Sequence, residues 1–195
     1  MQRLILASSN LGKLAELGEL LTPSGWQVVV KPADLEIEET GLTFRANAHL
    51  KALGVARATG EWALADDSGL EVRALAGAPG VYSARYGATD SERIARLLTA
   101  MQGKFDRAAR FVCVVALASP TAIVLDAEGT CEGEVLDAPR GSAGFGYDPI
   151  FWMRSLDKTF AELEIEEKQS YSHRGRAVRR LIDEMRRLGL PERTD

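Results

Sequence analysis

The chain is poor in the residues that build zinc sites and disulfide frameworks. Its 195 residues include two cysteines, Cys113 and Cys131, and two histidines, His49 and His173. A structural zinc site uses four Cys or His ligands at short spacings, and the sequence contains no such set. Two cysteines in strand-like segments are more often buried small side chains than a disulfide. Any metal in this protein is therefore expected on carboxylates.

Long apolar runs and an excess of positive charge are also missing. No stretch approaches the roughly 20 apolar residues that cross a bilayer, and the apolar start at Leu4 to Ala7 is too short for a signal peptide. The net charge is -4, whereas nonspecific nucleic-acid binding needs a basic excess. These absences predict a cytoplasmic protein with no membrane and no nucleic-acid partner. A local group of lysines could still bind the phosphates of one nucleotide.

Apolar periodicity and turn residues predict alternating strands and helices in a single domain, without linkers or repeats. The composition, 46% hydrophobic and 27% charged, is typical of a globular protein. The simplest fold is α/β, a mixed sheet with helices packed on it. Expected strands cover 3–7, 26–30, 62–65, 111–118 and 122–136, and expected helices cover 11–21, 42–57, 91–101, 159–168 and 172–188.

Two adjacent carboxylates stand where a buried strand should meet a loop. Asp66 and Asp67 directly follow the apolar run Trp62 to Ala65, and Ser68-Gly69 comes next. A carboxylate taken out of water needs a cation, a metal or several donors, and a glycine lets a ligand approach the backbone. Adjacent strand residues point to opposite faces, so both carboxylates reach one metal only if the strand ends between them. We interpret this segment as the floor of a metal-dependent active site.

Ser8 to Lys13 lies between the first strand and the first helix. Such a turn exposes backbone N–H groups at the positive end of the helix dipole, and Lys13 adds a full charge, so phosphate binding is one interpretation. The segment is not a Walker A loop, and alone it would more often be a capped turn.

Three glutamates, Glu36, Glu38 and Glu39, precede the second expected helix, which carries Lys51. Acidic residues there commonly complement the helix dipole. Alternatively, one glutamate together with Asp67 binds Mg²⁺, which takes one or two protein carboxylates plus waters and substrate phosphates. Lys51 is either a second phosphate contact or a surface lysine.

Two further segments could recognise a base. Phe145 lies between two glycines, which leaves its ring free to stack on a planar base, and Asp148 could accept a hydrogen bond from a ring N–H. A tight turn with a packed aromatic fits that segment equally well. Lys168 and then His173-Arg174 stand at or before the start of the last helix, where cations oppose the dipole preference, so a purely structural explanation is weaker.

Together these segments resemble the inosine triphosphate pyrophosphatase family, in particular its bacterial XTP/dITP diphosphatases. The resemblance covers nearly the whole chain, and it is specific because of the joint order and spacing of segments that are individually weak. The matching stretches are 8–13, 38–44, Asn47, Lys51, 66–69, 77–86, 144–151, 167–168 and 172–175.

The resemblance implies hydrolysis of ITP, dITP and XTP to a nucleoside monophosphate and pyrophosphate, which cleanses the nucleotide pool. It implies an elongated mixed sheet in two lobes with the site in the cleft between them, and a homodimer. It also implies Mg²⁺ on Glu39 and Asp67, with Asp67 as the base for the attacking water and Asp66 in support. The implied substrate-binding residues are Ser8, Ser9, Asn10, Gly12, Lys13, Lys51, Ser68, Phe145, Gly146, Tyr147, Asp148, Lys168, His173 and Arg174.

The chemistry of these residue types agrees with the roles that the resemblance implies. Inosine and xanthine present a 6-keto acceptor to cationic donors, whereas adenine presents an amino donor, and such a mismatch is worth a factor of roughly 10⁴ to 10⁵. Guanine keeps the 6-keto group, so its exclusion must come from pocket shape. The alternatives are a Maf-type pyrophosphatase with other substrates, a nucleotide-binding module without turnover, and an RNA-binding protein using the C-terminal arginines.

Overall fold

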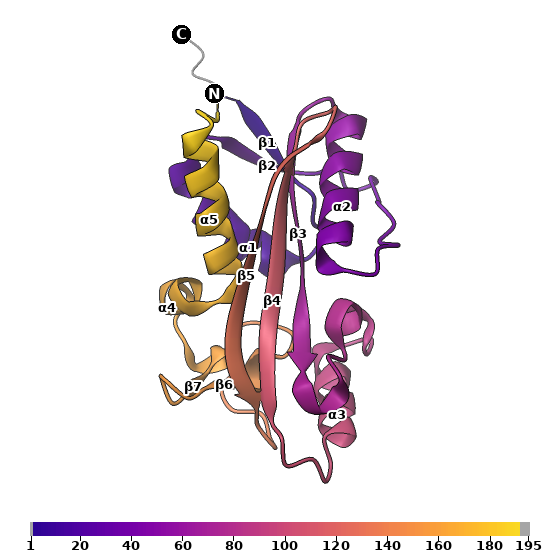
Figure 1. Cartoon of the computed structure of the whole chain (residues 1–195), viewed down its shortest axis with the longest axis vertical. Coiled ribbons are helices and arrows are strands. Elements are labelled where there is room, and N and C mark those ends of the chain that lie inside the picture. Colours follow the sequence, from indigo (N-terminus) through magenta and orange to yellow (C-terminus); the bar gives the residue numbers. More distant parts are fainter. Residues whose placement is uncertain (1, 192–195) are drawn as a thin grey trace.

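A seven-stranded mixed sheet forms the backbone of the computed structural model, which describes residues 2–191 (Figure 1). The strand order is β2-β1-β3-β4-β5-β6-β7. β1 is parallel to β2 and β3, and the other neighbours are antiparallel. The strands are Arg3–Leu6 (β1), Gln27–Val30 (β2), Trp62–Val72 (β3), Ala108–Ala118 (β4), Ile123–Val135 (β5), Phe151–Met153 (β6) and Lys158–Thr159 (β7).

Helices cover both faces of this sheet, and side chains cap their N-termini. Asn10, Thr43 and Ser172 each accept a hydrogen bond from a backbone N–H in the first turn of the helix that follows. The α-helices are Leu11–Leu21 (α1), Phe44–Thr59 (α2), Asp90–Ala100 (α3), Ile165–Tyr171 (α4) and His173–Arg187 (α5). The 3₁₀ helices are Thr22–Ser24 (η1), Arg73–Leu75 (η2), Gly80–Arg85 (η3), Asp148–Ile150 (η4) and Phe160–Glu162 (η5).

The buried apolar side chains form three clusters. Two of them lie in a first lobe and one in a second lobe, further along the long strands β3, β4 and β5. In the first lobe, α1 and α5 pack on one face of the sheet around Leu64 and Val115. α2 packs on the opposite face around Ala65 and Val114. The second lobe packs α3, β6 and η5 around Phe111 at the other end of β3, β4 and β5 (Figure 1). Polar residues of the middle of β3 therefore lie where the two lobes meet.

The predicted end of the third strand at Ala65 is wrong, because β3 continues to Val72. β4 pairs with it through the whole polar segment, with Asp66 opposite Val115 and Asp67 opposite Val114. The backbone hydrogen bonds of the segment are thus satisfied, and its charges are matched by side chains from both faces. Asp66 and Asp67 consequently point to opposite faces of an unbroken strand.

The predicted helix over 159–168 is also wrong. Thr159 belongs to β7, where it pairs with Trp152 of β6, and its side chain forms a capping box with Glu162 at the start of η5. α4 begins later, at Ile165, and runs to Tyr171. The acidic pattern suggested one continuous helix. The structure has two short helices in its place, η5 and α4, with a short break between them.

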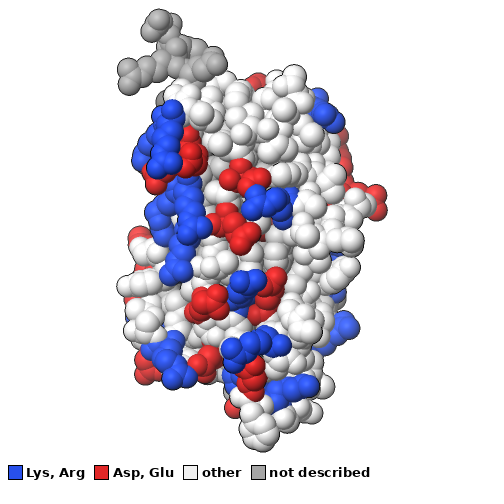
Figure 2. Space-filling view, in the orientation of Figure 1, with Lys and Arg blue, Asp and Glu red and all other residues white. Residues whose placement is uncertain are grey.

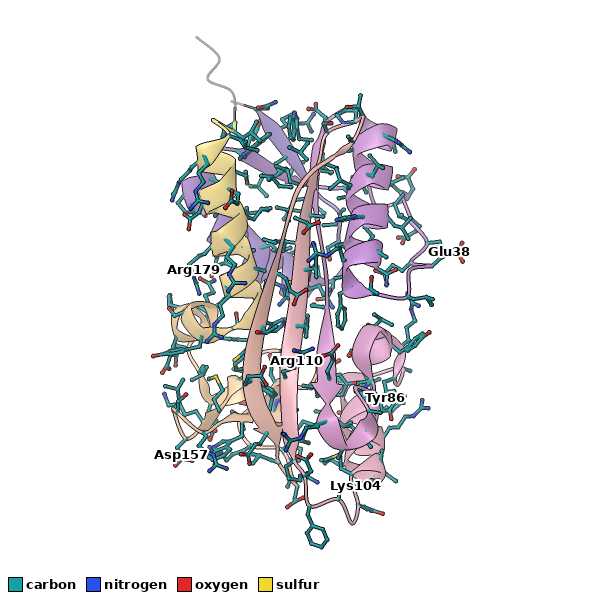
Figure 3. The ribbon with its side chains drawn as sticks, in the orientation of Figure 1. Glu38, Tyr86, Lys104, Arg110, Asp157 and Arg179 are labelled. Carbon is teal, nitrogen blue, oxygen red and sulfur yellow. The ribbon has the colours of Figure 1, made fainter. Side chains whose placement is uncertain are left out.

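Charges of both signs mix on the face shown in Figure 2, where the arginines of α5 run along one edge beside acidic side chains. Arg179 is one of these (Figure 3), and its guanidinium donates to the backbone carbonyls of Gln169 and Ser170. Arg180 likewise donates to the carbonyl of Glu128. This arrangement agrees with a solvated helix face. Within residues 2–191, no helix combines the length and the apolar character that crossing a membrane requires.

Candidate functional site

Two adjoining cavities lie in the cleft between the lobes, and they share Asn10, Lys13, Glu39 and Ala84. Every predicted site residue except Gly12 lines at least one of them. The aromatic cavity is lined, besides the shared residues, by Asp67, Ser68, Phe145, Gly146, Tyr147, Asp148, Lys168, His173 and Arg174. The lysine cavity adds Ser8, Ser9 and Lys51, together with Lys31 and Arg85, which the sequence did not single out as site residues.

The turn from β1 to α1 is ordered by its own side chains. Ser8 Oγ accepts from the backbone N–H of Asn10 at 3.2 Å, and Asn10 Oδ1 accepts from that of Lys13 at 3.0 Å. α1 therefore begins with its N-terminus at the cleft, where its dipole favours anions. Lys13 projects inward and lies 3.1 Å from Asp66 Oδ2. The turn thus places one full positive charge and the helix N-terminus at the junction of the two cavities.

Asp66 is a buried charge held by cations. Its side chain is fully buried, and Oδ2 lies 3.1 Å from both Lys13 Nζ and Arg174 NH2. Ser68 Oγ also donates to Oδ2 at 3.1 Å. Burial alone would raise the pKa of Asp66, but Lys13 and Arg174 outweigh it and hold the pKa far below its usual range. The cations therefore favour the ionised form of Asp66, which in turn holds them in place.

Asp67 faces the other side of β3, toward α2. Asn47 Nδ2 donates to Asp67 Oδ2 at 3.1 Å, and Lys51 Nζ lies 3.8 Å from Oδ1. Asn47 and Lys51 are one helical turn apart, so both reach the same carboxylate. Burial raises the pKa of Asp67, and Lys51 and Lys13 offset only part of that effect. Of the two aspartates, Asp67 is the one suited to accept a proton.

Glu39 completes this carboxylate group. Its Oε1 lies 2.6 Å from Lys51 Nζ, so one ammonium stands between Glu39 and Asp67. Burial would raise the pKa of Glu39, but Lys51 outweighs it and lowers the pKa. Glu38 also lines the lysine cavity, but it is exposed, no ion pair within 4 Å is formed by it among the described residues, and it points out at the edge of the molecule (Figure 3). The choice of Glu39 over Glu38 therefore has a structural basis.

The carboxylates fit an open divalent-cation site rather than a closed one. Within residues 2–191, no group of three or more His, Cys, Asp or Glu side chains could hold a metal. Glu39 and Asp67 offer two carboxylates to the same cavity edge, where both are now paired with the ammonium of Lys51. Magnesium typically binds one or two protein carboxylates and completes its shell with waters and substrate phosphates. The two residues therefore fit a magnesium that arrives with a phosphorylated ligand.

Phe145 packs against α1 at Gly12, which is the one predicted site residue that lines neither cavity. A Cβ on Gly12 would lie 2.5 Å from Phe145 Cδ1, so only glycine allows the ring to approach this closely. The ring also lies under Lys168 Nζ, 4.8 Å from the centroid. Gly12 therefore makes room for Phe145 instead of lining the site itself.

A buried charge network stands behind the aromatic cavity. Lys168 Nζ donates to Asp148 Oδ2 at 2.6 Å and to Glu16 Oε1 at 2.7 Å. Arg174 donates to the other oxygen of Glu16 as well as to Asp66 and Ser68. The cations thus have fixed positions, because each is shared by two buried carboxylates. Sequence reasoning missed Glu16, which lies on the α1 helix among leucines.

His173 is buried at the edge of this network, where its neutral form is favoured. Burial lowers its pKa well below the usual value, and Arg174 and Lys168 lower it further. The ring stacks on Phe111 with centroids 4.6 Å apart. Within the described part of the chain, its Nδ1 is buried without a hydrogen-bond partner. A neutral imidazole has one donor and one acceptor, so His173 can hydrogen-bond to an uncharged group in the aromatic cavity.

The loop that carries Phe145 is tied to the second lobe by residues that the sequence did not indicate as functional. Asp90 Oδ2 accepts from the backbone N–H of Gly146 at 2.7 Å, and Tyr147 donates from its hydroxyl to the carbonyl of Ser83 at 3.0 Å. The sequence gives Asp90 no role beyond its position next to the expected helix over 91–101. No local pattern could show its partner, which lies 56 residues further along the chain.

Comparisons with known proteins show sequence similarity over nearly the whole chain. A family model described as the Ham1 family matches residues 4–184. A protein of Gloeobacter violaceus named dITP/XTP pyrophosphatase is 60% identical, over 93% of this chain and 93% of its own. A protein of a Nostoc species with the same name is 58% identical over the same shares.

Solved structures match almost the whole chain at lower sequence identity. A HAM1 protein from Coxiella burnetii superposes with a TM-score of 0.88 at 45% identity, and the match covers 96% of this chain and 100% of that one. The Ham1 protein of Staphylococcus aureus superposes with a TM-score of 0.86 at 40% identity over the same shares.

Proposed function

Because the chain belongs to the Ham1 family, we propose that it hydrolyses dITP, XTP and ITP to the nucleoside monophosphate and pyrophosphate. The name dITP/XTP pyrophosphatase of the relatives at 58% and 60% identity supports this assignment. The observation that carries it is the junction of the two cavities at Lys13 and Glu39, with Asp67 beside them. A nucleotide with its base in the aromatic cavity and its phosphates in the lysine cavity would present its phosphoanhydride at this junction.

The lysine cavity supplies the positive charge that phosphoanhydride cleavage needs. Ser8 to Lys13 and Lys51 would hold the phosphates, since a helix N-terminus and two ammonium groups converge there. Cleavage of this bond depends on positioning and on neutralising charge, and it needs no protein nucleophile. Bound Mg²⁺, on Glu39 and Asp67, would add charge neutralisation at the phosphate oxygens.

Asp67 is the proposed general base. Its raised pKa favours proton uptake from a water in the cleft, and the hydrogen bond from Asn47 fixes the orientation of the carboxylate. Asp66 does not share this role, because it is paired with two cations on the opposite face of β3. Asp66 instead holds Lys13 and Arg174 in place.

The aromatic cavity is the proposed base site. Phe145 would stack on the purine, and Lys168, His173 and Arg174 would present donors to its 6-keto oxygen. The carboxylates of Glu16 and Asp148 fix the direction of the Lys168 ammonium, and those of Glu16 and Asp66 fix the Arg174 guanidinium. A site with fixed donors leaves them unpaired against the 6-amino group of adenine, which disfavours ATP.

Two further proposals rest on the family resemblance alone. We expect the protein to act as a homodimer and to work in the cytoplasm. A Maf-type activity is disfavoured, because the relatives at the highest identities reported above carry the dITP/XTP name.

Product analysis tests the proposed reaction. The protein is incubated with dITP and Mg²⁺, and the products are separated by anion exchange. We expect dIMP and pyrophosphate in equal amounts and no reaction in excess EDTA. Release of inorganic phosphate with dIDP would contradict the proposed bond cleavage, and undiminished turnover in EDTA would contradict the metal requirement.

A further inference from the structure

Arg85 and Glu39 form an ion pair between two segments that both line the lysine cavity. Arg85 NH2 donates to Glu39 Oε2 at 2.7 Å. Arg85 is the last residue of η3, which lies between α2 and α3 (Figure 1), whereas Glu39 precedes α2. The pair therefore links the second lobe to the segment that carries a proposed metal ligand.

Both carboxylate oxygens of Glu39 are occupied by cationic groups, Oε1 by Lys51 and Oε2 by Arg85. A divalent cation on Glu39 would stand beside these groups and repel them. Lys51 is nearly buried and also pairs with Asp67, so it cannot move far. Arg85 is 53% exposed, and within residues 2–191 Glu39 is the one carboxylate within 4 Å of it. Arg85 is thus the group that can leave at little cost.

The same cavity offers Arg85 another anionic partner. Arg85 lines the lysine cavity together with Ser8, Ser9, Lys13 and Lys51, which are the proposed phosphate-binding residues. A guanidinium matches phosphate oxygens well, because its donors form a planar fork. The terminal phosphates of a bound triphosphate would therefore lie within reach of a side chain that is released from Glu39.

We propose that Arg85 exchanges partners during the reaction, leaving Glu39 when a divalent cation binds there and donating to the terminal phosphates of the nucleotide. This inference rests on the proposed function, and it makes Arg85 a substrate-binding residue for the pyrophosphate half. It also makes Arg85 a competitor for the metal ligand, so cation and triphosphate bind together more readily than the cation alone.

The exchange predicts two shifts of opposite sign in Arg85→Ala, each measured by binding at equilibrium. The affinity for Mn²⁺ alone, followed by the signal of free Mn²⁺ in electron paramagnetic resonance, rises about threefold because Glu39 loses a competitor. The affinity for inorganic pyrophosphate with Mg²⁺, measured by calorimetry, falls about tenfold or more because a charge-assisted contact is lost. The affinity for dIMP does not change. Arg85→Lys keeps the charge and falls between wild type and Arg85→Ala in both measurements.

Arg73→Ala is the matched control. Arg73 also follows β3 and is exposed, but it pairs with Asp106, with Nε 2.5 Å from Oδ2. This variant should bind Mn²⁺, pyrophosphate and dIMP as wild type does. Thermal unfolding of each variant shows whether it is folded, and Arg85→Lys supplies the comparison if Arg85→Ala is not.

Unchanged binding, or a change of the same sign for Mn²⁺ and pyrophosphate, would overturn the exchange. If wild type releases pyrophosphate from dITP while Arg85→Ala shows no opposite shifts, the exchange alone is wrong. If wild type neither releases nor binds pyrophosphate, the proposed function is wrong, and the exchange falls with it.

Discussion

Asn47 donates its side-chain amide to Asp67 across 3.1 Å, and its carbonyl oxygen accepts from the backbone N–H of Gly41 at 2.8 Å. One buried amide therefore fixes both the proposed base and the segment that carries Glu39. Asn47→Ala should lower kcat for dITP about tenfold, because the carboxylate loses its orientation. It should also destabilise the fold by about 1–3 kcal/mol, because a buried donor loses its partner. Steady-state kinetics and urea unfolding check the two effects.

Arg45→Ala is the control for that variant. Arg45 lies on the same helix, but it pairs with Asp126 and is half-exposed. Its removal should leave kcat unchanged. An Asn47→Ala enzyme as active as wild type would show that Asp67 needs no such support.

Glycine substitutions in α1 separate base binding from helix stability. Gly12→Ala brings a methyl group into the Phe145 ring, so the ring must move and KM for dITP should rise at least tenfold. A Cβ on Gly18 of the same helix meets nothing within 4 Å, so Gly18→Ala should stabilise the protein by about 1 kcal/mol and leave KM unchanged. Equal KM values for the two variants would contradict the proposal that Phe145 belongs to the base site.

Glu16→Gln tests the charge network behind the base site. It weakens the hold on Lys168 and Arg174, although Asp148 and Asp66 still pair with them. We expect a folded protein, destabilised by about 1–3 kcal/mol, with a reduced preference for dITP over dATP. Glu19→Gln, one turn later and exposed, is the matched control and should behave as wild type. An unchanged preference in Glu16→Gln would mean that the network is structural only.

The two adjacent aspartates should affect stability in opposite directions. The pKa of Asp67 is raised, so its ionised form destabilises the folded state above the unfolded pKa of about 3.8. Asp67→Asn should therefore raise Tm at pH 7 while abolishing activity, and the gain should shrink as pH falls toward 4. The pKa of Asp66 is lowered, so its charge stabilises the fold above the same pH. Asp66→Asn should lower Tm at pH 7, and calorimetry at pH 7 and pH 5 checks both signs.

The predicted family is confirmed by the comparisons, and the mixed sheet with a cleft between two lobes is confirmed by the structure. Most element positions followed from local periodicity. The end of β3 did not, because two carboxylates in a strand are tolerated only through Lys13, Arg174, Asn47 and Lys51, which come from other elements. A strand whose charges are matched by tertiary contacts has no local sequence signal.

The same limit explains the missed site residues. Glu16 resembles an ordinary glutamate in a helix, and its partners Lys168 and Arg174 are 152 and 158 residues away. Asn47 was among the positions that carry the family resemblance but had no assigned role. Its spacing of four to Lys51, which places both side chains on one helix face, could have indicated one. Asp90 showed no local sign of its role. Its contact with Gly146 joins two segments that meet only in the folded chain.

We propose that a donor-lined base site and Asp67 together select and hydrolyse dITP, XTP and ITP. Pyrophosphate release, measured with Mg²⁺ over dITP, XTP, ITP, GTP, dATP and dTTP for wild type and Asp67→Asn in parallel, tests this claim most directly. We predict kcat/KM for dITP, XTP and ITP at least about 100-fold above that for dATP, and near-complete loss in Asp67→Asn. Comparable turnover of dATP, or an active Asp67→Asn enzyme, would contradict it.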